Sequence, residues 1–261
     1  MKILITGVSS GIGLSLARLF QNEDVWGLAR RRPPEDLGIR FSACDVTQWT
    51  QVEQVAEELK QQWTRLDAVI HCAAVQGAVG KAMDLDPQAW ADTVRSNIEG
   101  AYFVVRAFFP LLLQDTSKRG KALLFSGGGA SKPRPFFSAY GCAKTALVRL
   151  VETLAAEWTD LPIDINIVAP GAINTAMTQE VVKLGPQSTG EEESRRAHAQ
   201  LESGGDSLAK LHEMVRFLIS EASDGLSGRF ISAQWDKPET ILRSIRDPSR
   251  SEEFTLRRSV P

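Results

Sequence analysis

Thr6-Gly7-Val8-Ser9-Ser10-Gly11-Ile12-Gly13 is the stretch that decides the fold of this chain. It begins at the end of an apolar, strand-like run, Ile3–Thr6, and precedes the amphipathic stretch Leu14–Phe20. Glycines allow a tight turn and let the backbone approach a pyrophosphate, which binds at the positive N-terminus of the following helix. A strand before the glycines and a helix after them are the context that such a site requires. Thr6–Gly13 therefore predicts a phosphate-binding turn rather than a merely tight connection.

Short apolar runs alternate with stretches of helical periodicity along the chain, which is typical of βαβ units and a parallel sheet. We predict seven strands, at Ile3–Thr6, Asp24–Leu28, Ile39–Ser42, Ala68–His71, Ala122–Phe125, Asp164–Val168 and Arg229–Ser232. Helical stretches with apolar faces lie between them, at Val52–Trp63, Ala143–Trp158 and Leu208–Leu218. The expected fold is α/β, a doubly wound parallel sheet of the Rossmann type with helices on both faces.

A chain of 261 residues fits one domain, and we predict a single domain, 1–261. Two segments within it interrupt the alternation of strands and helices. Thr178–Gly205 is polar and rich in Gly, Ser and Glu, so we expect a long functional or disordered loop, and a substrate lid at about residues 176–205. The tail at about residues 234–261 is charged and weakly periodic. It either wraps over a neighbour or is mobile.

Composition excludes several kinds of partner. Apolar residues make up 43% of the chain, charged residues 24%, and the net charge is -2, which favours neither nucleic acid nor an acidic membrane surface. No stretch approaches the roughly 18 consecutive apolar residues of a membrane span, and the first strand leaves no room for a leader. Three scattered cysteines (Cys44, Cys72 and Cys142) do not make a disulfide framework. We therefore predict a reducing, cytoplasmic location.

The residues after the second predicted strand indicate which dinucleotide binds. An NAD site usually offers an acidic residue there, about 20 residues beyond the glycine turn, to bond the ribose hydroxyls. This chain has Ala29 and then Arg30-Arg31-Arg32. A guanidinium can hold a 2′-phosphate through two hydrogen bonds, so we predict that NADP(H) is preferred, with NAD(H) as the alternative. The competing interpretation is a solvated basic turn before Pro33-Pro34.

Tyr140-Gly141-Cys142-Ala143-Lys144 opens a long predicted helix and places Tyr140 and Lys144 on one helical face. A phenol with an ordinary pKa of about 10 is a poor acid or base at neutral pH. A neighbouring ammonium favours the phenolate and lowers the pKa of the phenol. The pair is therefore a candidate proton donor with its activator.

Together with the glycine turn, this pair makes the chain resemble the short-chain dehydrogenase/reductase family, in its compact branch, from Met1 to about Ala233. Thr6–Gly13 matches that branch's Thr-Gly-x-x-x-Gly-x-Gly pattern. Further family-like segments are Asp45-Val46, Asn97-Ile98-Glu99-Gly100 and Pro170-Gly171-Ala172-Ile173-Asn174-Thr175. The resemblance implies an oxidoreductase that moves a hydride between nicotinamide and a small carbonyl or alcohol substrate.

The resemblance also implies roles for the matching residues. Tyr140 is expected to act as general acid in reduction and as base in oxidation. Lys144 would bond the nicotinamide ribose and lower the pKa of the tyrosine, and Asn97 would hold a water that links Lys144 to solvent. The expected cofactor-binding residues are Thr6, Gly7, Ser9, Ser10, Gly11, Ile12, Gly13, Arg30, Asp45, Val46, Cys72, Ala73, Ala74, Tyr140, Lys144, Pro170, Gly171, Ile173 and Thr175.

Two positions depart from the family pattern. His71-Cys72-Ala73-Ala74 stands where the family has Asn-Asn-Ala-Gly, and we expect an adjusted ribose site there; His71 has no partner ligands at metal-binding spacing, so no metal is expected. The family's substrate-polarising serine falls on Gly127. We predict that Ser126 replaces it as a catalytic residue, with Ser131 or backbone N–H groups as the alternatives.

The sequence says less about substrate and assembly. Pro133–Phe137 is expected to form the pocket floor, with phenylalanines toward an apolar substrate and Arg134 toward an anion, or else to be plain packing. By resemblance, Asn97–Leu113 and Ser138–Trp158 are expected to form a homodimer or homotetramer. The competing functions are a non-catalytic NADP(H)-binding regulator, favoured by Gly127, and a dehydratase or epimerase, which the glycine spacing disfavours.

Overall fold

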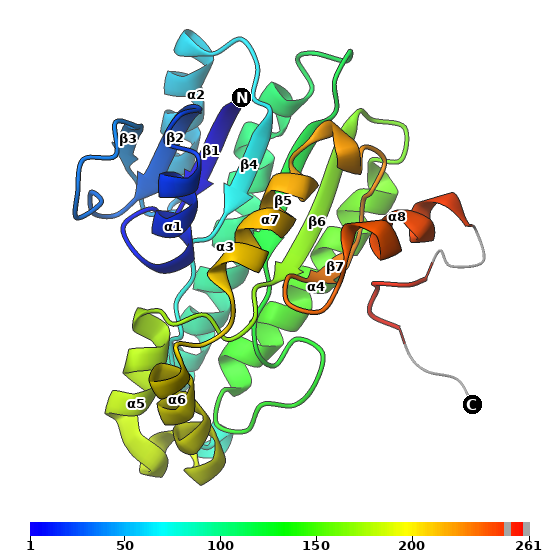
Figure 1. Ribbon diagram of the computed structural model, residues 1–261. Helices are drawn as coiled ribbons and strands as arrows, with labels where there is room; N and C mark the ends of the chain where they lie inside the picture. Colours follow the sequence, from blue (N-terminus) through cyan, green and yellow to red (C-terminus); the bar gives the residue numbers. More distant parts are fainter. Residues whose placement is uncertain (248–251, 258–261) are drawn as a thin grey trace.

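The computed structural model describes residues 1–247 and 252–257, which form a seven-stranded parallel sheet between two layers of helices (Figure 1). The strands lie in the order β3-β2-β1-β4-β5-β6-β7. Their bounds are β1 Lys2–Thr6, β2 Asp24–Ala29, β3 Arg40–Ala43, β4 Ala68–His71, β5 Gly120–Phe125, β6 Ile163–Ala169 and β7 Phe230–Ser232. The predicted doubly wound fold and all seven predicted strands are confirmed, each bound to within two residues.

Helices cover both faces of the sheet. The main helices are α1 Gly11–Leu19, α2 Trp49–Gln62, α3 Pro87–Leu112, α4 Ser138–Glu157 and α7 Leu208–Leu218, with short 3-10 turns at Ala82–Asp84 and Glu221–Ser223. Successive residues of a strand point to opposite faces. In β1, Ile3 and Ile5 pack with α1 and α7, whereas Leu4 packs with α2, α3 and α4. Because both faces are covered, the central strands β1 and β4 are nearly continuous apolar runs.

The winding of the chain changes direction between β1 and β4. From β1 the chain passes to β2 and β3 on one side, and β4 to β7 follow on the other. In such sheets the ligand crevice lies outside the carboxyl ends of the strands at this switch point. Thr6 and His71 are paired at the ends of β1 and β4, so the residues that follow them line this crevice.

The expected polar loop Thr178–Gly205 is instead a pair of helices, α5 Ala176–Thr189 and α6 Glu191–Ser203. Figure 1 shows them beyond the carboxyl edge of the sheet. The loop prediction is wrong because this pair buries few side chains; Val181 and Ala197 are its buried apolar residues. Gly185, with a φ of 70°, interrupts α5 and further hides the helical pattern.

The described part of the tail packs on its own chain. After α8 (Pro238–Arg246), residues 252–257 return along β7 and α4. Phe230 N donates a hydrogen bond to Phe254 O at 2.6 Å, and Leu256 N donates to the Glu152 carboxylate at 2.6 Å. Residues 248–251 and 258–261 of the predicted tail lie outside the described residues.

Four aromatic side chains in the second half of α3, Tyr102, Phe103, Phe108 and Phe109, differ in exposure. Phe108 is fully buried in the core, while Tyr102 is 41% exposed. Phe103 and Phe109 are partly buried against neighbouring rings of the same chain. Of the four aromatic residues considered, Tyr102 is the one that this surface can offer to another subunit.

Candidate active site

The carboxyl edge of the sheet opens into a cavity of about 1510 Å³. Pockets for single small ligands span about 300–1,000 Å³, so this one has room for a dinucleotide and a substrate together. Its wall includes Tyr140, Lys144, Ser126 and the expected cofactor-binding residues, with the exception of Thr6. Asn97 also lies behind the wall and does not line the cavity.

The glycine turn brings backbone to the cavity surface. A Cβ at Gly13 would lie 2.4 Å from Gly7 O, so no side chain fits there and α1 starts directly against β1. The side chain of Ser10, the residue before α1, makes no capping hydrogen bond. The cavity wall at Ser10–Gly13 is therefore a helix N-terminus, whose positive end attracts an anion.

Thr6 lies beneath this wall and fixes the segment after β4. Its Oγ1 accepts hydrogen bonds from Cys72 N at 3.1 Å and Ala73 N at 3.0 Å, and it lies 3.1 Å from His71 Nδ1. A hydroxyl that accepts twice has one proton to give, so His71 Nδ1 accepts it. Burial, and then the charge of Lys144, lower the pKa of His71 to about 3. Neutral His71 and Thr6 thus hold Cys72 and Ala73 on the cavity wall.

The basic turn after β2 reaches the same cavity. Arg30 and Arg31 line it with exposed side chains, and among the described residues neither has an ion-pair partner. Arg32 instead lies over the Phe41 ring, 5.1 Å from its centroid. Two guanidinium groups are therefore available to an anion at this end of the cavity.

The turn Pro170–Thr175 lies next to the glycine turn in the cavity wall. A Cβ at Gly11 would be 3.5 Å from Thr175 Cγ2. Ala172 N donates to the Asp206 carboxylate at 2.7 Å, which holds the turn in place. Thr175 precedes α5 but its side chain makes no capping hydrogen bond, so the hydroxyl is available to a ligand.

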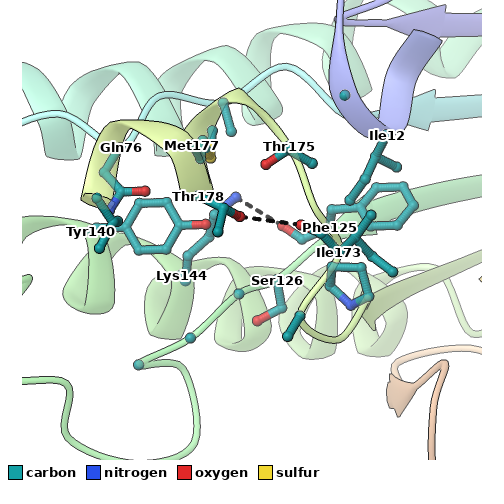
Figure 2. A pocket seen from close by; sticks show the side chains of 18 of the residues that line it. Ile12, Gln76, Phe125, Ser126, Tyr140, Lys144, Ile173, Thr175, Met177 and Thr178 are labelled. Carbon is teal, nitrogen blue, oxygen red and sulfur yellow. Dashed lines mark hydrogen bonds between the residues drawn. The ribbon is translucent and has the colours of Figure 1, made fainter. Parts of the chain in front are cut away.

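Tyr140 and Lys144 lie on one face of α4, as predicted, and Figure 2 shows both at the cavity. Lys144 Nζ lies 5.5 Å from the centroid of the Tyr140 ring and donates to Phe125 O at 3.0 Å. Burial lowers the pKa of Lys144 to about 8. Burial raises the pKa of Tyr140, and the charge that opposes this rise is that of Arg134. Activation of Tyr140 by Lys144 stays a prediction.

Asn97 acts on the loop after β4. Its Nδ2 donates to Val75 O at 3.0 Å and to Thr93 O at 2.9 Å. The Oδ1 of Asn97 is buried, and no described residue forms a hydrogen bond with it. The amide nitrogen is therefore committed to structure, and the oxygen is the atom left for the predicted water.

Ser126 presents a free hydroxyl at the site of the missing family serine. It is 3% exposed, its Oγ has no hydrogen-bond partner in residues 1–247 and 252–257, and it lines the cavity (Figure 2). A Cβ at Gly127 would lie 2.5 Å from Tyr140 Oη, so the tyrosine occupies the space that a side chain at position 127 would need. Ser131 also lines the cavity, but it is exposed.

The loop Pro133–Phe137 meets α6 at the cavity mouth. Arg134 Nε donates to the Glu193 carboxylate at 2.9 Å, and the guanidinium lies 3.8 Å from the Phe137 ring centroid. Arg134 is therefore not free to meet an anion, because Glu193 neutralises it. Phe137 is fully buried, so Phe136 alone of the two phenylalanines lines the cavity.

Sequence reasoning did not identify the individual cavity residues that come from α5, from α6 and from the loop after β4. They include Gln76, Met177, Val181, Glu193, Ala197 and Gln200. Gln76 lies two residues after the altered segment His71–Ala74, and that departure from the family pattern is the signal that points to this loop. The sequence predicts a lid at about residues 176–205, but it predicts a loop there, so nothing singles out the individual residues of α5 and α6 that line the cavity.

In residues 1–247 and 252–257, no helix has the length and apolar character needed to cross a membrane. Nor does this part of the chain bring together three or more His, Cys, Asp or Glu side chains in a group able to hold a metal ion.

The fold, the glycine turn and the Tyr140–Lys144 pair define a dinucleotide-binding protein. The model of the short chain dehydrogenase family matches residues 1–184, and the chain belongs to that family. Members of this family are NAD(P)-dependent oxidoreductases that act on CH–OH and C=O groups.

Curated relatives and solved structures agree with this placement. The short chain dehydrogenase pigC of Monascus ruber is 33% identical over 214 residues, which are 82% of this chain but 65% of that longer protein. Benzil reductase ((S)-benzoin forming) IRC24 of Saccharomyces cerevisiae is 30% identical over 71% of this chain and 76% of its own length. A variant of actinorhodin polyketide ketoreductase, solved with NADPH, has the same fold: TM-score 0.77 and 23% identity, covering 88% of this chain and 94% of that one.

Proposed function

We propose that this protein reduces neutral, apolar ketones or aldehydes with NADPH, and oxidises the corresponding alcohols in the reverse direction. The observation that carries the proposal is that Tyr140, Lys144 and Ser126 share one cavity with the glycine turn. Family membership supports the same class of reaction.

The residues of the cavity fit NADPH. The uncapped N-terminus of α1 suits a pyrophosphate, because its backbone N–H groups and helix dipole favour an anion. Within the part of the chain that the structure describes, Arg30 and Arg31 have no ion-pair partner, and their guanidinium groups suit a 2′-phosphate. NADH lacks that phosphate and would leave both guanidinium groups unpaired, which supports a preference for NADPH.

Reduced nicotinamide supplies a hydride when bound. Tyr140 Oη donates a proton to the substrate oxygen as the carbonyl becomes an alcohol, and takes a proton back in oxidation. Ser126 Oγ donates a hydrogen bond to the same oxygen and stabilises its developing negative charge. Lys144 bonds the ribose hydroxyls and its charge favours the tyrosinate, while Asn97 Oδ1 accepts a hydrogen bond from the water that links Lys144 to solvent.

The substrate part of the cavity supports an uncharged substrate. Val181 and Phe136 pack in one cluster with Tyr140 and, like Met177, contribute apolar surface to the cavity. The charges of Arg134 and Glu193 cancel at the mouth. The yeast relative is named for the reduction of benzil, which is an uncharged, apolar ketone.

A non-catalytic NADP(H)-binding regulator is the second candidate. Gly127 favours it, since the position of the family serine carries no side chain. Against it, the unpartnered hydroxyl of Ser126 lies one residue away in the same cavity, where it can serve the reaction.

The test is titration of the purified protein with NADPH and NADH, followed by assays on neutral ketones and aldehydes with wild type and Tyr140→Phe side by side. We expect tighter binding of NADPH than of NADH, turnover by wild type, and a loss of about 10²–10⁴-fold in kcat for the variant, which still binds NADPH. Binding without turnover of any carbonyl would favour the regulator. Failure to bind either nucleotide would overturn the proposal.

A further inference from the structure

Besides Ser126, the cavity wall has a second buried polar side chain without a partner. Gln76 is 4% exposed, and its buried Nε2 has no hydrogen-bond partner among the described residues. A buried amide without a partner costs free energy, so native proteins retain one mainly where a ligand or water completes it. The reaction proposed above gives Gln76 no task.

The backbone on both sides of Gln76 is fixed against α3. Val75 O accepts from Asn97 Nδ2 at 3.0 Å, and Ala78 N donates to Thr93 Oγ1 at 2.8 Å. Gly77 has a φ of 69°, and a Cβ there would lie 2.1 Å from Thr93 Oγ1, so the loop packs directly on the helix. Gln76 therefore presents its amide from a rigid support, as a specificity-determining group must.

The surroundings of Gln76 select the kind of group it can bind. Figure 2 shows Gln76 and Ser126 at the same pocket with Tyr140 between them in that view. The neighbouring lining side chains Met177 and Val181 are apolar, and the nearby Arg134 is already paired with Glu193. An uncharged oxygen of the substrate is the partner that an amide N–H can take here without burying a further charge.

We propose that Gln76 is a specificity-determining residue that donates a hydrogen bond to a second, uncharged oxygen of the substrate. The preferred substrates are then carbonyl compounds with a neighbouring carbonyl oxygen, in which Tyr140 and Ser126 hold the reacting oxygen and Gln76 holds the other. This assignment rests on the proposed carbonyl reduction. It explains why the amide is buried, rigidly supported and unpartnered.

The experiment compares two probes with the same carbon skeleton, 1-phenylpropane-1,2-dione and 1-phenylpropan-1-one, on the full-length enzyme with NADPH. Wild type should prefer the dione. Gln76→Leu should lower kcat/KM for the dione about tenfold, mainly through KM, and change that for the monoketone less than twofold. The matched control is Gln200→Leu, which removes a cavity amide that already has a partner, Thr178 Oγ1 at 3.1 Å, and should leave the ratio of the two substrates unchanged.

The assignment would be overturned if Gln76→Leu left the ratio of kcat/KM for the dione to kcat/KM for the monoketone unchanged, including by lowering both values equally. The binding of both probes to the enzyme with NADP⁺, measured by calorimetry, tests the role of Gln76 separately from the proposed reductase function. If wild type reduces neither probe but binds the dione about tenfold more tightly, and Gln76→Leu abolishes that difference, the reductase proposal fails and the role of Gln76 stands. If neither turnover nor binding distinguishes the probes, the role of Gln76 fails.

Discussion

Two glycine-rich turns leave the sheet at the same carboxyl edge, and their glycines serve different purposes. The turn after β1 leads directly into α1, and Gly13 has no side chain because Gly7 O occupies the space. The turn after β5 does not open a helix, and Gly127 has no side chain because Tyr140 Oη occupies the space. The first turn presents backbone for a ligand's phosphates, whereas the second makes room for the protein's own proton donor. The same residue type thus carries nucleotide binding in one turn and catalytic geometry in the other.

The largest expected effect concerns the hydroxyl of the second turn. Ser126→Ala should lower kcat about 10²–10³-fold, because it removes a hydrogen-bond donor to the developing negative charge. Nucleotide affinity, which depends on the first turn, should not change. Steady-state kinetics and fluorescence titration with NADPH measure the two quantities. The matched control is Ser131→Ala, at an exposed serine of the same cavity, and equal kcat values for the two variants would refute the role of Ser126.

Adding a methyl group to one turn at a time should separate catalytic geometry, which depends on Gly127, from nucleotide binding, which depends on Gly13. Gly127→Ala, and likewise Gly127→Ser, should displace Tyr140 and lower kcat by about 10²-fold while NADPH still binds. Gly13→Ala should instead weaken NADPH binding, because Gly7 O must move. Gly128→Ala is the control, since a Cβ there meets Arg134 Cδ at an ordinary 3.4 Å. A gain of activity in Gly127→Ser would contradict the geometry described here.

The smallest effect is expected at the nucleotide end of the cavity. Arg30→Ala should weaken NADPH binding about tenfold and leave NADH binding unchanged, because the guanidinium is expected to pair with the 2′-phosphate, which NADH lacks. Arg32→Ala is the matched control, since Arg32 lies over Phe41 and does not line the cavity. Dissociation constants from titrations at fixed ionic strength test both. Equal losses for NADPH and NADH would mean that Arg30 contributes only general positive charge.

The sequence predicts the first turn far better than the second. The Thr6–Gly13 spacing is governed by local backbone chemistry, so its strand, helix and ligand class can be inferred together. In the second turn, the role of Gly127 depends on the position of Tyr140. The two residues belong to different elements, the turn after β5 and helix α4, so local sequence does not show that they are close. Ser126 could be proposed from the sequence only as the nearest hydroxyl.

Other parts of the site escape sequence reasoning for related physical reasons. Helices α5 and α6 have few buried apolar residues, so they lack the periodicity that identified α2 and α4. Gln76 is a single polar residue in a loop. That its amide nitrogen is buried without a hydrogen-bond partner among the described residues is seen only in the folded structure. Thr6 and Asn97 belong to the family pattern but lie behind the cavity wall, where they hold Ala73 and Val75.

The returning tail also bears on how this protein stays in solution. β7 is the last strand on its side of the sheet, and an edge strand with free N–H groups is a template for pairing with another chain. Phe254 O takes up the N–H of Phe230, so this edge is already capped by its own chain. The tail thus covers an edge strand that could otherwise pair with another chain. A chain shortened before Glu252 would lose this cover.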